Sequence, residues 1–241
     1  VKIAQRAENE FVGVASGIMD QFASMMGKAD RALFLDCRSL EYELIRTPFE
    51  EQGYAVVVIN SGVKRGLVSS EYNTRRLQCE EAVKLLQAAL PTIAALRDVT
   101  IEHLPLVNAL PPVLAQRARH VVTENHRVLK AITALEQGDL KEFGLLLNAS
   151  HHSLQHDFEV SCSELDLLAE LAQNFPGTLG SRMTGAGFGG CTVSLVPQAS
   201  LPLFKKQILE KYKRETMIEP EIYVFKASPG AHIKTRVLPQ S

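Results

Sequence analysis

The chain has 241 residues, with 26 lysines and arginines against 27 aspartates and glutamates, so its formal net charge is −1. Apolar residues make up 46% of the chain and charged residues 22%, values that are typical of a globular protein and exclude a disordered one. The balanced charge also excludes a general nucleic-acid binder, because such a protein needs a basic face that neutralises phosphates.

The length predicts one or two domains, each large enough to bury a core. The longest apolar run, 55–59, is far shorter than the roughly 20 residues of a membrane-spanning helix. Four widely spaced cysteines form no C-x-x-C pair, which favours reduced thiols over a zinc site. We therefore expect a cytoplasmic protein without a membrane partner. Because the chain starts with Val1 inside a predicted helix, we interpret it as part of a longer protein.

The first quarter of the chain predicts helix followed by strands. Residues 1–27 have a helical pattern that Gly13 and Gly17 interrupt, and two β-rich segments follow at 31–37 and 41–47. Residues 54–60 form a continuous β-branched run, which is typical of a buried strand.

A block of helices follows. The pattern predicts helices over 69–90, 112–137, 139–158 and 161–175, with Gly138 as a natural C-terminal stop of the second. Residues 180–190 then form a glycine-rich loop, before a strand at 191–196, a helix at 201–216 and a strand at 222–226. This mixture predicts an α+β fold rather than a regular βαβ series.

The glycine-rich loop carries the densest chemical signal. Closely spaced glycines let several backbone N–H groups approach one anion, although a merely structural turn is the alternative. Gly185, Gly187 and Gly190 satisfy G-x-G-x-x-G, but a dinucleotide fingerprint must open a helix and this loop precedes a strand. Residues 66–70 have two interpretations: a helix start that binds phosphate, or a helix capped by Ser69 or Ser70. The adjacent Glu71 favours the cap, because its carboxylate would repel an anion.

Two further groups have a chemical and a plain interpretation. His151, His152 and His156 cluster near Asp157; His152 and His156, four residues apart on one helix face, could bind a metal, but a solvated helix face fits the pattern better. Arg75 and Arg76 lie within reach of nearby glutamates, which predicts charge pairs on a helix surface.

Asp20 is a carboxylate among otherwise apolar side chains, and Glu8 lies twelve residues earlier in the same helical region, beside Asn9. Burying a carboxylate in such surroundings is costly unless it is paired or used in chemistry, although a partly exposed surface position is the ordinary explanation.

Four segments resemble the galactokinase family of the GHMP small-molecule kinases: 7–9, 17–22, 70–76 and 182–190. The last is shared across the superfamily, whereas Gly-Ile-Met-Asp-Gln and Ser-Glu-Tyr in this order are more specific. The resemblance implies that Asp20 is the catalytic residue and contacts the sugar hydroxyl that accepts phosphate. It further implies that Tyr72 binds the sugar, that Glu8 helps to hold Mg²⁺, and that one loop lies beside the phosphates of ATP. The residues of that loop are Gly185, Ala186, Gly187, Phe188, Gly189 and Gly190.

The resemblance also implies a two-domain fold. Residues 1–62 would end an N-terminal kinase domain, and residues 63–241 would form a helical and ferredoxin-like α/β C-terminal domain. The expected activity is ATP-dependent phosphorylation of the anomeric hydroxyl of galactose by a monomer. The family's N-terminal sugar motif, main ATP loop and catalytic arginine are not among these residues, so we expect this segment alone to be inactive. The alternatives are an N-acetylhexosamine kinase of the superfamily and a non-catalytic sugar sensor.

Overall fold

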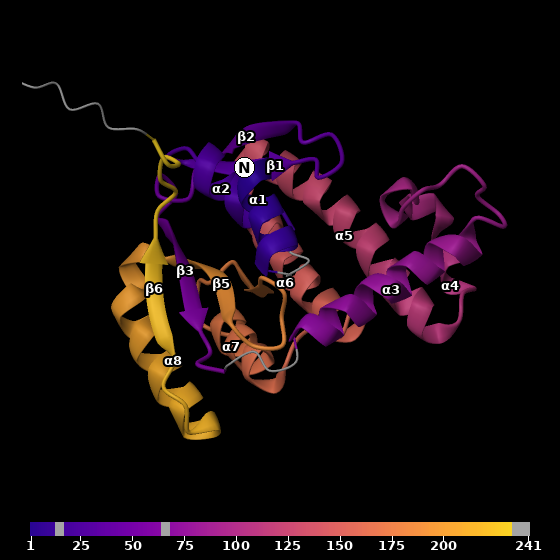
Figure 1. Ribbon diagram of the computed structural model, residues 1–241. Helices are drawn as coiled ribbons and strands as arrows, with labels where there is room; N and C mark the ends of the chain where they lie inside the picture. Colours follow the sequence, from indigo (N-terminus) through magenta and orange to yellow (C-terminus); the bar gives the residue numbers. More distant parts are fainter. Residues whose placement is uncertain (13–16, 64–67, 233–241) are drawn as a thin grey trace, which may run out of the picture. The chain divides into compact units, whose positions relative to one another are not determined.

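The computed structural model describes residues 1–12, 17–63 and 68–232, which divide into two compact units (Figure 1). The first unit combines Val1–Thr47 with the chain from Lys226 onwards, and the second is Pro48–Phe225. Within the described ranges, none of the helices combines the length and the apolar character that crossing a membrane requires.

The first unit contains short helices and one hairpin. Its elements are α1 (Lys2–Arg6), a π-helical segment (Ala7–Val12), α2 (Met19–Met26), β1 (Arg31–Leu35) and β2 (Tyr42–Arg46). The prediction of helix and then two strands is confirmed, with β1 and β2 pairing antiparallel. Phe22 of α2 is buried, and its ring meets that of Tyr42 edge-on at 5.6 Å between centroids.

The C-terminal segment joins this unit through its backbone. The N–H groups of Gly230 and Ala231 donate to the carbonyl oxygens of Gly27 and Ser24, each at 2.7 Å. These bonds explain why residues distant in sequence belong to the unit that contains α2.

The second unit contains a four-stranded antiparallel sheet in the order β4-β5-β3-β6. Its strands are β3 (Tyr54–Asn60), β4 (Gly180–Thr184), β5 (Cys191–Pro197) and β6 (Glu221–Phe225). Helix α7 (Ser163–Gln173) precedes β4, and α8 (Leu201–Thr216) joins β5 to β6. This β-α-β-β-α-β order with β3 and β5 at the centre is the ferredoxin-like arrangement, so the predicted fold class is confirmed.

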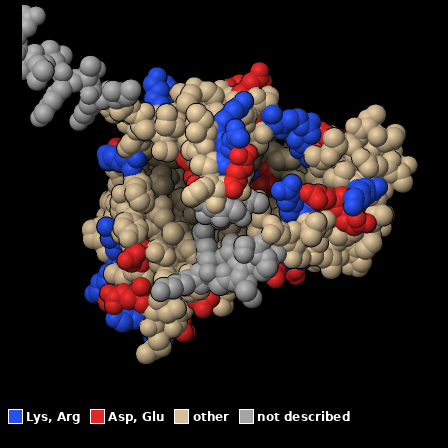
Figure 2. Space-filling view, in the orientation of Figure 1, with Lys and Arg blue, Asp and Glu red and all other residues tan. Residues whose placement is uncertain are grey.

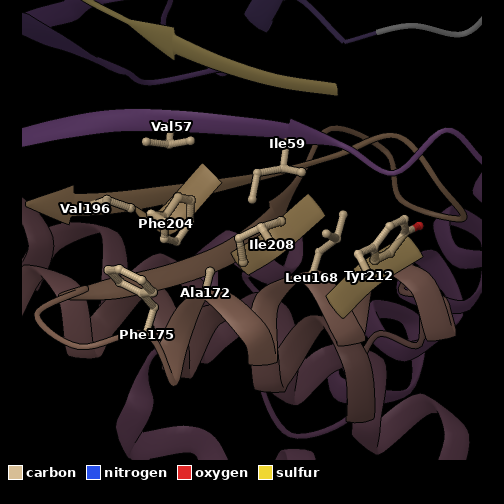
Figure 3. Close-up of a cluster of buried hydrophobic side chains, with 9 residues drawn as sticks. All are labelled: Val57, Ile59, Leu168, Ala172, Phe175, Val196, Phe204, Ile208 and Tyr212. Atoms are coloured by element: carbon tan, nitrogen blue, oxygen red, sulfur yellow. The ribbon is translucent and has the colours of Figure 1, made fainter. Parts of the chain in front are cut away.

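The main apolar core lies between this sheet and the helices α7 and α8 (Figure 3). Val57 and Ile59 of β3 are fully buried against these helices because alternate residues of a strand face the same side. Phe175 and Phe204 contact edge-on at 5.1 Å, and the Tyr212 hydroxyl donates to the Ser61 carbonyl at 2.8 Å.

A helical insertion lies between β3 and α7 in sequence. It contains α3 (Val68–Leu86), α4 (Leu104–Asn108), α5 (Pro112–Gln137) and α6 (Leu140–His156), with 3-10 turns at Leu96–Asp98 and Ile101–His103. Another 3-10 turn, Gln198–Ser200, precedes α8. The predicted helices are confirmed, and Gly138 ends α5 in the left-handed conformation (φ 71°). Gly66 lies outside the described residues, as do the side chains of Ser69 and Ser70, so the predicted cap stays a prediction.

The boundary between the compact units falls earlier than the predicted domain boundary. Residues 48–62 belong to the second unit because β3 donates and accepts backbone hydrogen bonds on both edges, to β5 and to β6. The expected division of a longer protein at 62/63 stays a prediction.

Candidate functional site

Glu8 and Asp20 lie in the first unit. Asp20 is exposed in the first turn of α2, where the helix dipole favours a negative charge. The side-chain amide of Gln21 donates to the Glu8 carboxylate at 2.8 Å, so the π-helical segment meets the helix that carries Asp20. The structure therefore brings Glu8 to the residue next to Asp20, although they are separated by a dozen positions in sequence.

The glycine-rich segment divides into a strand and a tight connection. Residues 180–184 form β4, which corrects the expectation that the whole of 180–190 is a loop; they pair with 191–195 of β5. Only 185–190 forms the loop, and we call these six residues the glycine loop. Its backbone is left-handed at every position except Ala186, with φ between 57° and 125°.

The glycine loop is fixed to its surroundings by its backbone. The Phe188 N–H donates to the Val160 carbonyl at 2.7 Å, and the Ser61 N–H donates to the Gly190 carbonyl at 2.8 Å. A Cβ atom on Gly187 would lie 2.0 Å from the same Val160 oxygen, so only glycine fits this position. The N–H of Phe188 thus has a partner inside the protein.

Tyr72 and the glycine loop line one pocket of about 310 Å³. Gly185, Ala186 and Phe188 contribute one side, and α3 contributes Tyr72, which is 41% exposed. The other lining residues are Arg75, Arg76, Leu154, Phe158 and Val160. Tyr72 and the glycine loop, which the sequence predicted as functional, therefore line the same pocket, although more than a hundred residues separate them in the chain.

The segment 157–160 supports this pocket, and two arginines hold it. Arg75 of α3 donates to the carbonyl oxygens of Phe158 (2.7 Å) and Glu159 (2.8 Å). Arg117 of α5 donates to the Asp157 carbonyl at 2.6 Å and forms an ion pair with the Glu159 carboxylate. These bonds stabilise the backbone of this segment, in which Glu159 adopts a left-handed conformation (φ 51°).

The predicted surface pairs are confirmed for Arg76 but not for Arg75. Arg76 pairs with Glu80 at 2.9 Å, and both side chains are exposed. The side chain of Arg75 is only 12% exposed, and its contact with Glu71 is a longer 3.4 Å. The reason is that one arginine faces solvent, whereas its neighbour on α3 faces the segment 157–160.

Sequence analysis missed Arg117, which is 3% exposed. The sequence contained one signal of its burial: Arg117 lies on the apolar face of α5, together with Leu114, Ala118 and Val121. An arginine on the apolar face of a helix must find internal acceptors, because a buried unpaired charge is strongly unfavourable.

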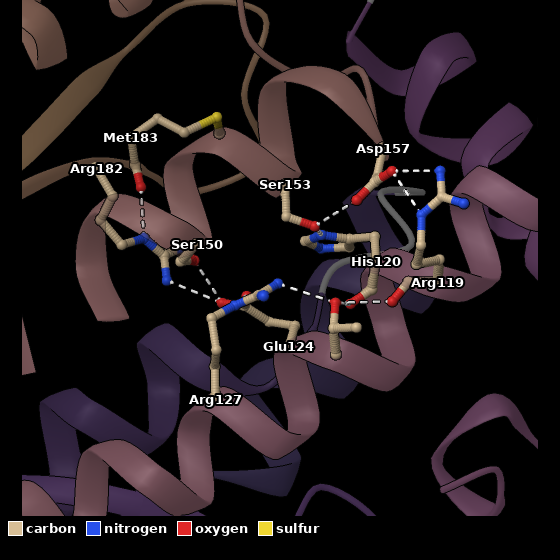
Figure 4. A network of polar contacts seen from close by, with 10 residues as sticks. Arg119, His120, Glu124, Arg127, Ser150, Ser153, Asp157, Arg182 and Met183 are labelled. Atoms are coloured by element: carbon tan, nitrogen blue, oxygen red, sulfur yellow. Dashed lines mark hydrogen bonds and ion pairs between the residues drawn. The ribbon is translucent and has the colours of Figure 1, made fainter. Parts of the chain in front are cut away.

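A polar network fixes the strand that leads into the glycine loop (Figure 4). Glu124 of α5 accepts from Ser150 at 2.5 Å, from Arg127 at 2.8 Å and from Arg182 of β4 at 3.4 Å. Burial alone would raise the pKa of Glu124, but the Ser150 hydrogen bond and the two arginines hold this pKa below its usual value. The carboxylate therefore stays charged and orders β4.

The three histidines of α6 do not share one solvated face. His151 is buried, and its Nδ1 accepts the N–H of Met183 at 3.2 Å, whereas His152 and His156 are exposed. The solvated face predicted for His152 and His156 is therefore confirmed, whereas His151 faces β4. Among residues 1–12, 17–63 and 68–232, no cluster of three or more histidine, cysteine or acidic side chains is suited to a metal ion.

His120 provides a pH-dependent test of this packing. Burial lowers the pKa of its imidazole to about 4, with Arg127 and Arg182 acting in the same direction and Glu124 and Asp157 against it. The unfolded chain binds this proton below about pH 6.5, so stability falls as the pH drops from about 6.5 to 4. The expected loss is up to about 3 kcal/mol in the free energy of unfolding.

Urea unfolding of the parent, His120→Gln and the exposed control His152→Gln across this pH range measures the effect. We expect the pH-dependent loss to shrink only in His120→Gln. An equal pH dependence in all three proteins would contradict the prediction.

Residues 131–214, from within α5 into α8, match the model of the family described as GHMP kinases C terminal. Over 96% of its length the chain is 47% identical to a galactokinase of Enterococcus faecalis, and it spans 59% of that protein.

A solved structure supports the same relationship. The crystal structure of Lactococcus lactis galactokinase complexed with galactose superposes with a TM-score of 0.89 at 40% identity. The match covers 95% of this chain and 59% of that chain. The fold is therefore that of a galactokinase over the aligned part, and the chain spans about three fifths of these relatives.

Proposed function

We propose that the protein to which this chain contributes is a galactokinase, which transfers phosphate from ATP to the anomeric hydroxyl of galactose as the first step of galactose catabolism. The observation that carries the proposal is the match to the galactose complex of the Lactococcus lactis enzyme, at a TM-score of 0.89. Asp20, Glu8, Tyr72 and the glycine loop, which lie in the segments that resemble galactokinases, support it.

Asp20 would orient the sugar hydroxyl for in-line attack on the γ-phosphate and accept its proton. An aspartate carboxylate is a much weaker base than a sugar alkoxide, so the proton moves late and Asp20 acts mostly by orientation. Its exposed position on α2 supports this role, because a carboxylate that reaches a substrate must not be sealed in the core.

Glu8 would hold Mg²⁺, which supplies charge neutralisation for the phosphates when bound. The residues fit this ion: Glu8 is beside Gln21, whose Oε1 is buried without a hydrogen-bond partner among the described residues. Oxygen ligands of this kind suit Mg²⁺, which takes only one or two carboxylates and keeps several waters. The π-helical turn that carries Glu8 supports a functional role, because such turns concentrate at functional sites.

The glycine loop would contact the phosphates of ATP, while Tyr72 would bind the sugar across the pocket. Gly185 and Ala186 line the pocket without side chains that obstruct a ligand. Further proposals are that the protein is a cytoplasmic monomer without a nucleic-acid or membrane partner. On the face in Figure 2, basic and acidic side chains are interspersed, which supports the absence of a nucleic-acid surface there.

Tyr72→Phe is expected to raise KM for galactose about tenfold, because one hydrogen bond to a neutral hydroxyl is lost. KM for ATP should not change. Tyr223→Phe is the matched control, since this tyrosine of β6 is 46% exposed and bonds Glu221 instead. Steady-state kinetics with each substrate varied in turn measures both constants, and an unchanged galactose KM in Tyr72→Phe would remove the proposed contact.

The activity itself is tested by incubating the full-length protein with Mg-ATP and galactose and measuring galactose 1-phosphate. Parallel reactions with N-acetylgalactosamine and a galactose-binding assay separate the alternatives. Turnover of galactose supports the proposal; preferred turnover of the N-acetylated sugar, or binding without turnover, contradicts it. The 241-residue segment by itself should produce no galactose 1-phosphate, because the main ATP loop is expected outside it.

A further inference from the structure

Arg75 connects three parts of the second unit that are remote in sequence. Its guanidinium donates to the carbonyl oxygens of Phe158 and Glu159 at 2.7 and 2.8 Å. The same group lies 5.9 Å from the centroid of the Phe188 ring, within range of a cation–π contact. One largely buried side chain of α3 therefore touches both the segment 157–160 and the glycine loop.

The segment 157–160 in turn fixes the glycine loop. The next carbonyl after the two that Arg75 binds is that of Val160, which accepts the Phe188 N–H at 2.7 Å. Gly187 packs so closely on this oxygen that even a methyl group would not fit. A displacement of residues 158–160 must therefore displace the loop.

Tyr72 shares its helix with Arg75, one turn earlier. Because both belong to α3, the bonds of Arg75 also set the separation between Tyr72 and Gly185–Phe188 on the two sides of the pocket. A guanidinium suits this task, since its planar fork binds two carbonyls at fixed geometry, whereas an ammonium offers a single point charge.

We propose that Arg75 is a positioning residue that holds the glycine loop at a fixed distance from Tyr72, through the carbonyls of Phe158 and Glu159 and through the Phe188 ring. The arginine touches no reacting atom in this scheme. Its consequence for phosphate transfer rests on the proposed function, whereas its effect on the loop does not.

Hydrogen exchange of the full-length protein tests the effect on the loop directly. Arg75→Met should increase amide exchange in peptides that cover 185–190 by about tenfold or more, because the Phe188 N–H loses its fixed acceptor. Arg75→Lys should give an intermediate increase. Arg214→Met, which removes an exposed arginine of α8 that pairs with Glu215, should give none.

The same variants are then assayed for galactose phosphorylation. We expect Arg75→Met to lower kcat/KM by up to about a hundredfold, since a displacement of about 1 Å in a positioned group has this effect. Arg75→Lys should recover part of the loss.

Two exchange results would overturn the proposal: unchanged exchange at 185–190 in both Arg75 variants, or an increase spread equally over α8 and the sheet. The second would mean that Arg75 only stabilises the fold. If the loop responds as expected while the unsubstituted protein does not phosphorylate galactose, the positioning role stands and the proposed function fails.

Discussion

The Asp20→Asn variant of the full-length protein is expected to lose about three orders of magnitude in kcat for galactose phosphorylation. The asparagine keeps the size of the side chain but cannot accept a proton from the attacking hydroxyl, and it presents an amide where a carboxylate would align that hydroxyl. KM for both substrates should change much less than kcat, because the interaction is made mainly in the transition state.

Asp30→Asn is the matched control for this variant. Asp30 is exposed in the same unit and adopts a left-handed conformation (φ 55°), which asparagine tolerates. The control should keep its activity and stability. If Asp20→Asn turned over galactose at nearly the parental rate, the catalytic assignment of Asp20 would be wrong.

The Gly187→Ala variant should lose about 3 kcal/mol of unfolding free energy, the sum of a left-handed backbone and an overpacked contact. Its Cβ would lie 2.0 Å from the Val160 oxygen, and φ is 86°. The backbone at Gly187 and the backbone at Val160 cannot separate without breaking the Phe188–Val160 hydrogen bond, so the loop must move. Galactose phosphorylation should therefore fall by about a hundredfold as well.

Gly53→Ala separates the two contributions. Gly53 has a similar φ of 79°, but a Cβ there would meet no atom within 4 Å. This control should lose only about 1 kcal/mol, the cost of the left-handed backbone alone. Urea unfolding of both variants gives the comparison, and equal losses would mean that the Val160 contact does not constrain the loop.

Local patterns in the sequence were sufficient for the positions of most elements. The continuous β-branched run of 54–60 predicts the central strand, and the recurrence of apolar residues predicts the helices, because both patterns reflect which side chains face a core. Gly138 ends α5 as expected, since its left-handed conformation is a local property. The resemblance to galactokinases likewise depends on short segments that are contiguous in the chain.

The glycine loop illustrates where local patterns stop. Its glycines predict that the backbone approaches another group closely, but they do not identify that group. Gly187 approaches the Val160 carbonyl inside the protein, whereas Gly185 lines a pocket. The first half of the glycine-rich segment pairs as β4 because β5 offers it a partner. Small residues by themselves carry no signal for that pairing.

The burial and the partners of charged and titratable side chains depended most on the tertiary structure. Arg75 and Arg76 are adjacent on α3, yet one is nearly buried on backbone carbonyls and the other is exposed. His151 likewise faces β4, whereas His152 faces solvent. The sequence by itself thus determined most of the elements and the resemblance to a kinase family, which both follow from contiguous residues; the ferredoxin-like arrangement was implied only through that resemblance. Only the tertiary structure decided which charges are buried and what holds the loop, because those partners are remote in the chain: 32 positions separate His151 from Met183, and 84 separate Arg75 from Glu159.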